Sequence, residues 1–517
     1  MIKRDELLGQ IKTITKFDAI IIGGGAVGLG AGVDSATRGL KTIVLEKYDF
    51  AKGTSSRSTK LLHGGVRYLA QLHFHLVKDS LAEKVLLYKN APHLTKDCEF
   101  IMPCYNYFDL LFYRTGLALY DTLAGFPKNQ TSKFLSKQSI INKYPNIKKD
   151  KLIGGIAYHD GIFDDARLAL SLSQTILDLN SYAINYCEVT SFLKENNKII
   201  GVTVKDTILD QEFTLHSSCV INATGIFSDK LRKIDDPKAE NIVQSAQGVH
   251  IVVDQNCLPS KDALLVPKTE DGRVLFTVPW HNKVLIGTTD TPVSDSKIEP
   301  IPMIEEVDFI MQNINKYLDK PIQKTDIISV YAGIRPLIKE DKKNTSQISR
   351  EEKIVVSDSN LVSIIGGKWT SYRRMSEKLI DFVLDKEFIK AGQSKTANLK
   401  LHGYMPREKV ALLDEHLQPY GENISVLQSL EGAKEKLHPN LPFTKAQVIY
   451  AVRYEQAQTL DDVLSRRLRV LFLNAKQAIE MSTVVAHIMA TELNKSVAWE
   501  HEQIELFKII ANNYITK

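Results

Sequence analysis

Long apolar stretches and an excess of charge of one sign are both missing from this sequence of 517 residues. No run reaches the roughly 18 apolar residues that a transmembrane helix needs, so we expect no membrane-spanning segment. Residues 1–16, MIKRDELLGQIKTITK, mix charges of both signs and have no apolar core, which argues against a signal peptide. The formal net charge is only +5, without a concentrated basic stripe, so no nucleic-acid partner is expected.

Cysteine is scarce as well, and no two cysteines form a CxxC pair. Their number is odd and several lie in apolar surroundings, which is typical of reduced structural thiols in a reducing compartment. We therefore predict no disulfides and no metal site, and we expect the protein to fold in the cytoplasm. The five cysteines are Cys98, Cys104, Cys187, Cys219 and Cys257.

The length and the ordinary composition allow more than one domain with a large core. Residues 1–16 are predicted to form a short polar helix before the main fold. Phe17 to Ile22, with the sequence FDAIII, predicts a buried strand, and a glycine turn and a helical stretch to about Arg38 follow it. KTIVL at Lys41–Leu45 predicts a second buried strand, so this segment is a βαβ unit with a parallel sheet.

The glycine turn GGGAVG matches the dinucleotide-binding pattern G-x-G-x-x-G in the strand–turn–helix context that the pattern requires. Gly23 would allow the tight turn, Gly25 the approach of a pyrophosphate, and Gly28 the packing of the helix on the strand. The pyrophosphate would then lie at the helix N-terminus. Glu46 ends the second strand, where a ribose-binding acid is expected. We predict a bound dinucleotide, although the turn alone does not separate FAD from NAD.

Three later segments favour FAD. Thr54, Ser55 and Ser56 follow the second strand and offer hydroxyls to phosphate or ribityl oxygens. VINATG at 220–225 is an apolar strand that ends in a turn of small residues. IIGGK at 364–368 ends a late strand, and the N-terminus of the helix predicted after it could stabilise the negative charge of reduced flavin.

The remaining pattern predicts two further parts. Short β-rich runs at about 185–225 and 244–290 indicate an antiparallel sheet, and after about residue 390 apolar residues recur at helical spacing. We therefore predict an α/β fold with a Rossmann-type FAD-binding domain, an antiparallel-sheet substrate domain and a C-terminal helical domain. The predicted boundaries are 1–16 for the N-terminal helix, 17–390 for the discontinuous FAD-binding domain with the substrate sheet inserted at about 90–155 and 240–345, and 391–517 for the helical domain.

Taken together, GGGAVG, TSSRSTKLLHGGVRYL, INATG, GTTD, YAGIRPL and GGKWTSYR resemble the FAD-dependent glycerol-3-phosphate dehydrogenases, which belong to the superfamily of D-amino-acid oxidase. YAVRYEQAQTLDDVLSRRLR extends the resemblance into the C-terminal part, so that it covers roughly the whole chain after residue 16. It implies FAD, hydride transfer from C2 of sn-glycerol 3-phosphate to give dihydroxyacetone phosphate, and electron transfer to ubiquinone or menaquinone. Further predicted FAD contacts are Lys60, Gly64, Val189, Ala223, Gly225, Gly367 and Lys368.

The implied substrate is a phosphate monoester, and arginine binds such a dianion bidentately. Arg67 in HGGVRYL, Arg335 in YAGIRPL and Arg350 in SQISREEK match positions that the family uses for substrate contact. Tyr68 could add a hydroxyl. One departure is Gln247, since family members often carry a basic residue there, and this weakens any role of that strand in phosphate binding.

Oxidation of the C2 hydroxyl needs a general base with a pKa near neutrality. His63 is the first candidate by its intrinsic pKa. Arg335 and Lys368 are alternatives that would stabilise the developing alkoxide, and a lysine beside the flavin could have a depressed pKa. The sequence does not decide among these three residues.

Membrane contact is predicted from Tyr105–Phe126, which is rich in apolar and aromatic residues but is interrupted by Asp109, Arg114 and Asp121. The segment is too polar to span a bilayer and suits an interfacial position. Lysines between 128 and 151 follow it and would favour anionic lipid headgroups. The alternative is an ordinary core helix followed by a solvated loop. The resemblance favours peripheral attachment to the inner face of the cell membrane.

Other functions stay open at this point. An oxidase that passes its electrons to oxygen and makes hydrogen peroxide fits the sequence equally well. A related amine or amino-acid oxidase is disfavoured by HGGVRYL and YAGIRPL, and a non-catalytic flavin-binding sensor by the three arginines. The sequence does not determine the electron acceptor or the oligomeric state, for which a homodimer is one option.

Overall fold

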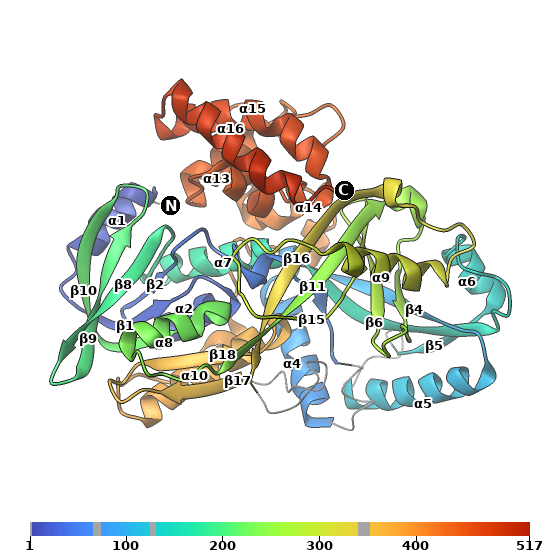
Figure 1. Cartoon of the computed structure of the whole chain (residues 1–517), viewed down its shortest axis with the longest axis horizontal. Helices are drawn as coiled ribbons and strands as arrows, with labels where there is room; N and C mark the ends of the chain where they lie inside the picture. Colours follow the sequence, from blue (N-terminus) through green and yellow to red (C-terminus); the bar gives the residue numbers. More distant parts are fainter. Residues whose placement is uncertain (1–2, 66–73, 125–130, 340–351, 517) are drawn as a thin grey trace.

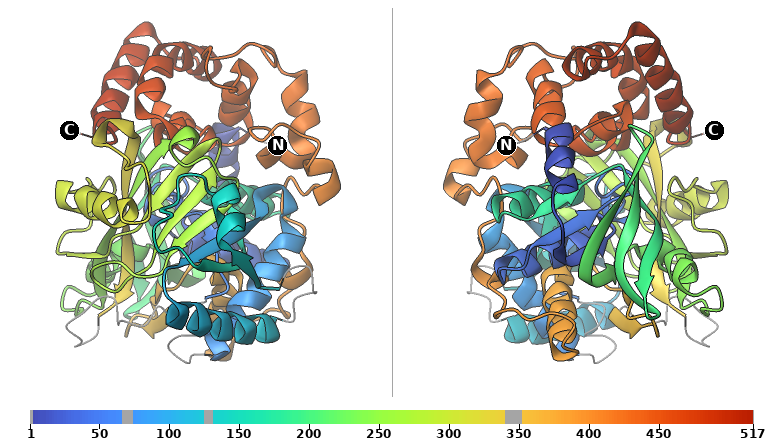
Figure 2. Two further views of the ribbon diagram at one scale, coloured as in Figure 1. Left: turned by 90° about the vertical axis from the view of Figure 1, so that its right-hand side faces the viewer. Right: turned by 90° about the vertical axis from the view of Figure 1, so that its left-hand side faces the viewer.

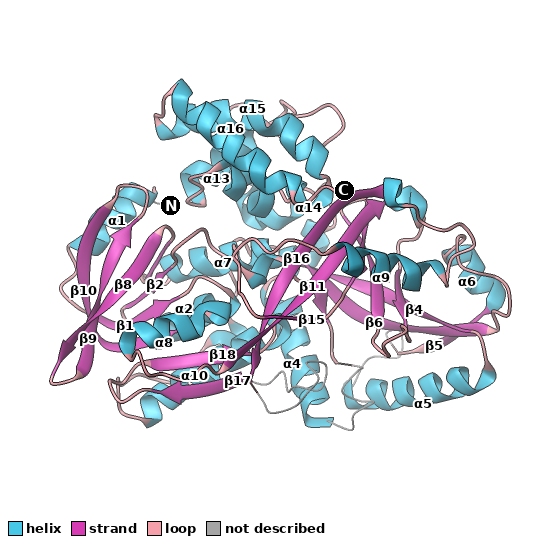
Figure 3. Ribbon diagram, viewed as in Figure 1, coloured by secondary structure: helices cyan, strands magenta, loops and turns pink. Residues whose placement is uncertain are grey.

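The computed structural model describes residues 3–65, 74–124, 131–339 and 352–516. Two β-sheets lie next to each other in the view of Figure 1, and helices from the C-terminal part of the chain lie above both of them. The two side views in Figure 2 show the same helical layer at one end of the molecule. Figure 3 shows helices on the outer faces of the sheets, as expected for an α/β fold.

The first sheet is built around the βαβ unit that the sequence predicts. Its central strand β1 (Phe17–Ile22) pairs in parallel with β2 (Thr42–Leu45) and with β10 (Gln211–Asn222). Every residue of β1 except Asp18 is buried, because helices cover both faces of a parallel sheet. Helix α2 (Ala26–Thr37) follows the glycine turn and packs on the sheet.

The other elements of this half surround that unit. The sheet continues with β7 (Tyr182–Ile184), β8 (Cys187–Glu195), β9 (Lys198–Asp206), β17 (Glu352–Val356) and β18 (Val362–Gly366). The helices of this half are α1 (Arg4–Lys12), α7 (Asp165–Asp178), α8 (Ser228–Asp235) and α10 (Tyr372–Asp385). Helix α1 buries Leu7, Leu8 and Ile11 in the core of this half, so it is amphipathic rather than polar throughout.

The β-rich run at about 185–225 joins this first sheet and not the second one. Strand β10 takes part in two ladders, because its N-terminal half pairs antiparallel with β9 and its C-terminal half pairs in parallel with β1. The hairpin of β8 and β9 therefore extends the dinucleotide-binding half. The run therefore forms antiparallel pairs, as the sequence predicts, but they extend the first sheet.

The second sheet is mainly antiparallel. Its longest ladder joins β11 (Val243–Asp254) to β16 (Ile327–Ile338) along nearly their whole length. The other strands are β3 (Leu61–Leu62), β4 (Thr95–Cys104), β5 (Lys133–Ser136), β6 (Gly154–Phe163), β12 (Ala263–Val266), β13 (Leu275–Trp280), β14 (Lys283–Gly287) and β15 (Thr291–Val293). Its helices are α4 (Phe74–Asn90), α5 (Tyr107–Ala124), α6 (Lys137–Lys143) and α9 (Ile304–Asn315).

The C-terminal part is helical, and its buried face joins the core of the second sheet. The predicted α/β class, with a Rossmann-type half, an antiparallel sheet and C-terminal helices, is confirmed. The helices are α11 (Arg407–Val410), α12 (Ile424–Ser429), α13 (Lys445–Tyr454), α14 (Val470–Leu473), α15 (Ala475–Leu493) and α16 (Val497–Asn512).

Candidate active site

A large cavity of about 1800 Å³ lies between the two sheets, and residues of both sheets line it. Its walls include the glycine turn after β1, the loop after β2, and the cavity-facing residues of β11 and β16. Drug-sized ligands occupy clefts of roughly 300–1,000 Å³. The cavity therefore has room for a dinucleotide together with a second, smaller molecule.

The glycine turn is shaped as the sequence predicts. Gly23 has a φ of 115°, a conformation that glycine adopts readily and residues with a Cβ rarely do. A Cβ on Gly28 would lie 1.9 Å from the carbonyl oxygen of Gly23, so the helix packs this closely only with glycine there. Gly25 and Ala26 line the cavity at the N-terminus of α2. The turn thus presents a helix N-terminus to the cavity, which is an anion site.

Glu46 and Ser55 hold this turn in place. The Glu46 carboxylate accepts hydrogen bonds from the backbone N–H of Gly24 at 2.6 Å and of Tyr48 at 2.8 Å. Burial raises the pKa of Glu46 above its ordinary value, and those two hydrogen bonds oppose the rise. The Ser55 hydroxyl accepts from the N–H of Ala26 at 3.0 Å. Glu46 also lines the cavity.

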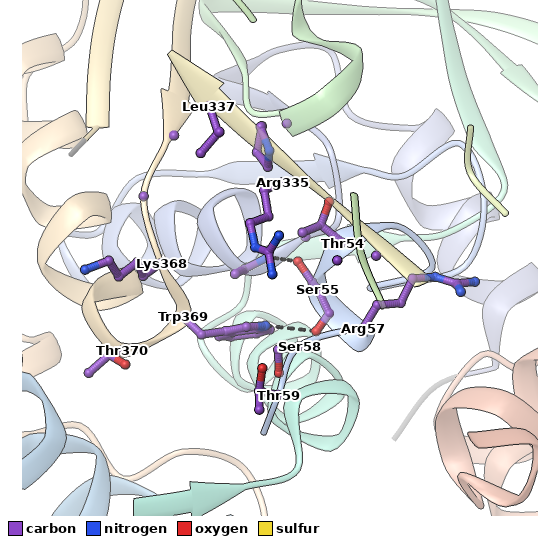
Figure 4. Close-up of a pocket in the computed structure, with 18 of the residues that line it drawn as sticks. Thr54, Ser55, Arg57, Ser58, Thr59, Arg335, Leu337, Lys368, Trp369 and Thr370 are labelled. Carbon is purple, nitrogen blue, oxygen red and sulfur yellow. Dashed lines mark hydrogen bonds between the residues drawn. The ribbon is translucent and has the colours of Figure 1, made fainter. Parts of the chain in front are cut away.

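Most of the predicted cofactor contacts line the same cavity. The Thr54 hydroxyl donates to the carbonyl of Ile334 at 2.6 Å, which ties the loop after β2 to the second sheet. The Trp369 indole donates to the carbonyl of Ser55 at 2.8 Å (Figure 4). The predicted contacts that line the cavity are Gly23, Gly25, Glu46, Thr54, Ser55, Val189, Ala223, Gly225, Gly367 and Lys368.

Four predicted cofactor contacts are not part of the cavity wall, namely Gly28, Ser56, Lys60 and Gly64. Lys60 is fully buried, where it forms an ion pair with Asp165 at 2.7 Å and donates to the Ser56 carbonyl at 2.7 Å. Its charge is therefore used inside the protein core. Ser56 is buried beside it. A Cβ on Gly64 would lie 2.1 Å from the Tyr120 hydroxyl, so this glycine serves close packing.

Arg335 lies on β16 and its guanidinium is fixed from several sides. It forms an ion pair with Asp290 at 3.0 Å and donates to the Thr288 hydroxyl at 3.1 Å and to the Thr289 carbonyl at 3.1 Å. Gly248, next to it on β11, has no side chain to displace it, because a Cβ there would lie 2.3 Å from the guanidinium. Figure 4 shows Arg335 pointing into the middle of the lining residues.

The other predicted substrate and catalytic residues divide into two groups. His63 and Lys368 both line the cavity, but the Lys368 side chain extends away from Arg335 in Figure 4, so the structure does not bring those two cations together. Arg67, Tyr68 and Arg350 lie outside the residues that the structure describes.

His250 on β11 is a site residue that the sequence analysis missed. Its ring stacks on Tyr331 with a centroid distance of 4.8 Å, and its Nε2 is 2.8 Å from the Thr59 hydroxyl. Burial lowers the pKa of His250 well below its ordinary value, and the cations of Lys60 and Arg335 act in the same direction. A signal was present, because a lone histidine in the apolar strand GVHIVVD is unusual. Its side chain faces the cavity.

Gln247, three residues before His250 on β11, turns the other way, as alternation along a strand requires. It is buried, and its amide donates to the Glu306 carboxylate at 2.7 Å and to the Ile301 carbonyl at 3.1 Å. The residue is not part of the cavity wall. The expected weakness of any phosphate-binding role at this position therefore has a structural reason.

Comparisons with known proteins agree with this geometry. Residues 18–371 match the FAD dependent oxidoreductase family, and residues 359–503 match the C-terminal domain of alpha-glycerophosphate oxidase. The chain is 38% identical over 542 residues to the mitochondrial glycerol-3-phosphate dehydrogenase of Macaca fascicularis, covering 98% of this chain and 74% of that one. It is also 38% identical over 539 residues to the Homo sapiens protein of the same name, covering 97% of this chain and 74% of that one.

Solved structures give the same result. The glycerol-3-phosphate dehydrogenase from Bacillus halodurans, complexed with FAD, matches with a TM-score of 0.81 and 29% identity, covering 99% of this chain and 98% of that one. The L-alpha-glycerophosphate oxidase from Mycoplasma pneumoniae shares the fold, with a TM-score of 0.58 and 16% identity, covering 74% of this chain and 98% of that one. The chain therefore belongs to the FAD dependent oxidoreductase family, in which the glycerol-3-phosphate dehydrogenases are its relatives.

Proposed function

We propose that this protein oxidises sn-glycerol 3-phosphate to dihydroxyacetone phosphate and passes the electrons to a membrane quinone, ubiquinone or menaquinone. The observation that carries the proposal is a fixed arginine, Arg335, and a buried histidine, His250, in the wall of a cavity that also contains a dinucleotide-binding turn. The relatives named glycerol-3-phosphate dehydrogenase support the choice of substrate.

The part of the cavity around the glycine turn fits FAD. The glycine turn leaves room for a pyrophosphate at the N-terminus of α2, and Glu46 faces the same space. Gly366 and Gly367 have φ values of 86° and 91°, which bends the chain before Trp369 and places these glycines in the cavity wall. When bound, FAD would accept the hydride that leaves C2 of the substrate.

The residues of the chain would handle the hydroxyl proton and the developing charge. Arg335 offers a fixed cation to the oxygen on C2, where negative charge grows as the hydride leaves. Burial favours the neutral form of His250, and a neutral imidazole can form a hydrogen bond with the C2 hydroxyl. His63, the first candidate for the base from the sequence, also lines the cavity and is the proposed base. We propose Lys368 as a flavin contact rather than the base, because its side chain extends away from Arg335.

An anaerobic titration tests the proposed reaction. The purified protein is expected to be yellow, and glycerol 3-phosphate under nitrogen should bleach that colour, whereas glycerol, which lacks the phosphate, should not. No histidine or cysteine lies in a recognisable covalent flavin-attachment motif, so acid denaturation should release all the colour into the supernatant. A yellow protein that glycerol 3-phosphate leaves unbleached would contradict the proposed substrate.

The proposed quinone route rests on apolar residues in the cavity wall. Leu76, Met102, Phe112, Leu119 and Phe276 are among them, and two of these lie on helix α5. Helix α5 runs along the outside of the second sheet in Figure 1. Apolar side chains of this outer helix therefore share one cavity with the residues of the proposed flavin site, which suits an acceptor that is dissolved in lipid.

Helix α5 exposes an unusually apolar face. Tyr107, Phe108, Leu111 and Phe112 are all exposed, whereas Leu117 and Tyr120 of the same helix are buried. None of the described helices is long and apolar enough to cross a bilayer. We propose that this face lies in the headgroup boundary of a membrane and keeps the protein peripherally attached.

The lysines after α5 contribute less charge than the sequence suggests. Lys133 and Lys143 both pair with Glu99, at 2.6 and 2.8 Å, and Lys149 pairs with Asp319 at 3.1 Å. Each basic residue near an anionic surface is worth about 1 kcal/mol when its charge is available. Because these pairs neutralise part of the charge, we expect the apolar term to dominate membrane binding and salt to weaken it only in part.

A double variant of two exposed residues of this face tests the docking. Phe108 and Leu111 are 78% and 67% exposed, and neither lines the cavity. Phe108→Glu with Leu111→Glu is expected to abolish sedimentation with liposomes and quinone reduction in membranes, while a soluble dye is still reduced by glycerol 3-phosphate.

A matched control for this variant lies at the other end of the molecule. Val497 and Ile509 on α16 are 64% and 66% exposed, and Figure 1 shows α16 far from α5. Val497→Glu with Ile509→Glu should leave liposome binding unchanged. If the α5 variant binds liposomes like the parent, the docking surface is not this face.

A further inference from the structure

Asp290 in the cavity wall has one buried carboxylate oxygen without a hydrogen-bond partner among the described residues. The residue lies between β14 and β15, its side chain is only 5% exposed, and it lines the cavity. Oδ1 accepts the hydrogen bond from Arg335 at 3.0 Å. Oδ2 is buried and has no hydrogen-bond partner among the residues that the structure describes. Buried polar atoms in native proteins nearly always have a partner, so a ligand in the cavity is the natural donor.

The charge of the Arg335–Asp290 pair indicates which end of the substrate meets it. The two side chains together carry no net charge, and a phosphate dianion placed against them would face the Asp290 carboxylate. Like charges at such short range repel each other strongly. A neutral, hydroxylated end of the substrate fits better, because it can accept from the guanidinium and donate to the carboxylate.

The need for a hydrogen-bond donor opposite Oδ2 further restricts which ligand groups can lie there. An ionised carboxylate only accepts hydrogen bonds, so the group that faces Oδ2 must carry an O–H or N–H. A methyl group, an aldehyde or a second carboxylate at this place would leave Oδ2 without a partner. In glycerol 3-phosphate, the C1 hydroxyl is the group that can donate from the end opposite the phosphate.

We propose that Asp290 accepts a hydrogen bond from the hydroxyl on the carbon next to the reacting carbinol, and thereby selects phosphates that carry a vicinal diol. The inference rests on the proposed function and adds a specificity-determining residue to it. In this arrangement Arg335 contacts the oxygen on C2, and the phosphate lies away from the Arg335–Asp290 pair.

A cycle of two substrates and two enzymes tests this assignment. The substrates are sn-glycerol 3-phosphate and the propane-1,2-diol 1-phosphate of matching configuration, in which hydrogen replaces the C1 hydroxyl. In kcat/KM, the wild type should prefer sn-glycerol 3-phosphate by roughly 10⁴-fold, which is the order of discrimination found for sites that hydrogen-bond a substrate hydroxyl. In Asp290→Ala this preference should fall to within about tenfold, because kcat/KM falls mainly for sn-glycerol 3-phosphate.

A second variant covers the case in which Asp290→Ala does not fold. Asp290→Asn keeps an oxygen for Arg335 but replaces a charge-assisted bond with a neutral one, which is roughly half as strong. Its preference should fall by at least about tenfold. Asp254→Asn is the matched control, because Asp254 also pairs with a cation, Lys283 at 2.6 Å, but does not line the cavity.

Three other outcomes of these measurements would contradict the proposal, each in a different way. If Asp290→Ala slows both substrates equally, Asp290 only positions Arg335, and the contact with the hydroxyl is refuted. If the preference is unchanged while the flavin content or the flavin spectrum shifts, Oδ2 faces the cofactor. A yellow wild-type protein that oxidises neither substrate would overturn the proposed function, and this inference with it.

Discussion

Arg335→Ala is expected to lower kcat/KM for sn-glycerol 3-phosphate by roughly 30-fold to several thousand-fold. Loss of a buried charge-assisted contact costs about 2–5 kcal/mol, which converts to this range of rate constants. The effect should appear largely in kcat, because the guanidinium meets charge that develops in the transition state. FAD content should stay normal, since Arg335 contacts Asp290, Thr288 and Thr289 and not the glycine turn.

Arg335→Lys separates the effect of charge from that of geometry, and Arg273→Ala is a control at another position in the cavity wall. Arg335→Lys restores the cation but not the planar fork, so it should recover only part of the lost activity. Arg273 is another arginine in the cavity wall, but it pairs with Asp271 near the surface. Arg273→Ala should therefore stay within a few fold of the parent. A near-wild-type kcat/KM for Arg335→Ala would show that Arg335 does not contact the substrate.

The glycine turn could be predicted from the sequence because its chemistry is local. Gly23, Gly25, Gly28 and Glu46 lie on consecutive elements, and the close approaches that exclude a Cβ occur within the same βαβ unit or on the adjacent β10. The aromatic face of α5 was also predictable, since its exposed residues are contiguous in the sequence. In both cases the physical constraint acts between residues that are near each other along the chain.

The substrate end of the site depends on contacts that spacing does not reveal. His250 lies in a strand that looks like core, and its role depends on Thr59 and Tyr331 from two other segments. Lys60 was assigned to the cofactor although it turns into the core, because the direction of a side chain in an irregular loop has no sequence period. The partner that absorbs its charge, Asp165, is 105 residues away in the sequence.

Long-range pairing also explains why the Arg335–Asp290 pair was not foreseen. The two residues are 45 positions apart, and the pairing of β11 with both β15 and β16 brings them together. The GTTD segment could be recognised as part of a family resemblance. Only the structure shows that its last residue, Asp290, lines the cavity, with one oxygen on Arg335 and a second, buried one that has no partner among the described residues.

Asp49→Ala is expected to destabilise the protein by about 3–5 kcal/mol, the usual cost of removing one partner from a buried ion pair. Asp49 accepts from Arg466 at 2.5 Å and from Arg467 at 2.9 Å, and all three side chains are buried. The variant would leave two guanidinium groups with less compensation in the core. Although burial acts to raise it, the cations of Arg467 and Arg466 hold the pKa of Asp49 below its usual value.

The lowered pKa of Asp49 predicts how the free energy of unfolding depends on pH. A carboxylate whose pKa is lower in the folded state stabilises the protein above its unfolded-state pKa of about 4, and this contribution is lost as the pH falls through the folded-state value. The wild type should therefore lose stability on acidification below about pH 4 more steeply than Asp49→Asn. Denaturant unfolding at several pH values measures this difference.

Asp381→Ala is the control for Asp49→Ala, because Asp381 pairs with Arg38 at 2.7 Å but is exposed. The buried Arg38 keeps its second partner, Asp34 at 2.6 Å, so this variant should unfold close to the parent. If Asp49→Ala also unfolds like the parent, the buried cluster does not hold the C-terminal helices to the first sheet.

The position of Asp49 adds a prediction about the cofactor. Asp49 follows Glu46 on the loop that meets the glycine turn, and the N–H of Ala51 on this loop donates to the Gly24 carbonyl at 2.9 Å. The arginines that hold Asp49 belong to the helical turn Asp462–Arg467 of the C-terminal part. We therefore expect Asp49→Ala to release FAD at denaturant concentrations below those that unfold the protein, whereas the parent should lose both together. Release and unfolding that coincide in the variant would show that the C-terminal part stabilises the fold without holding the adenosine end of the cofactor.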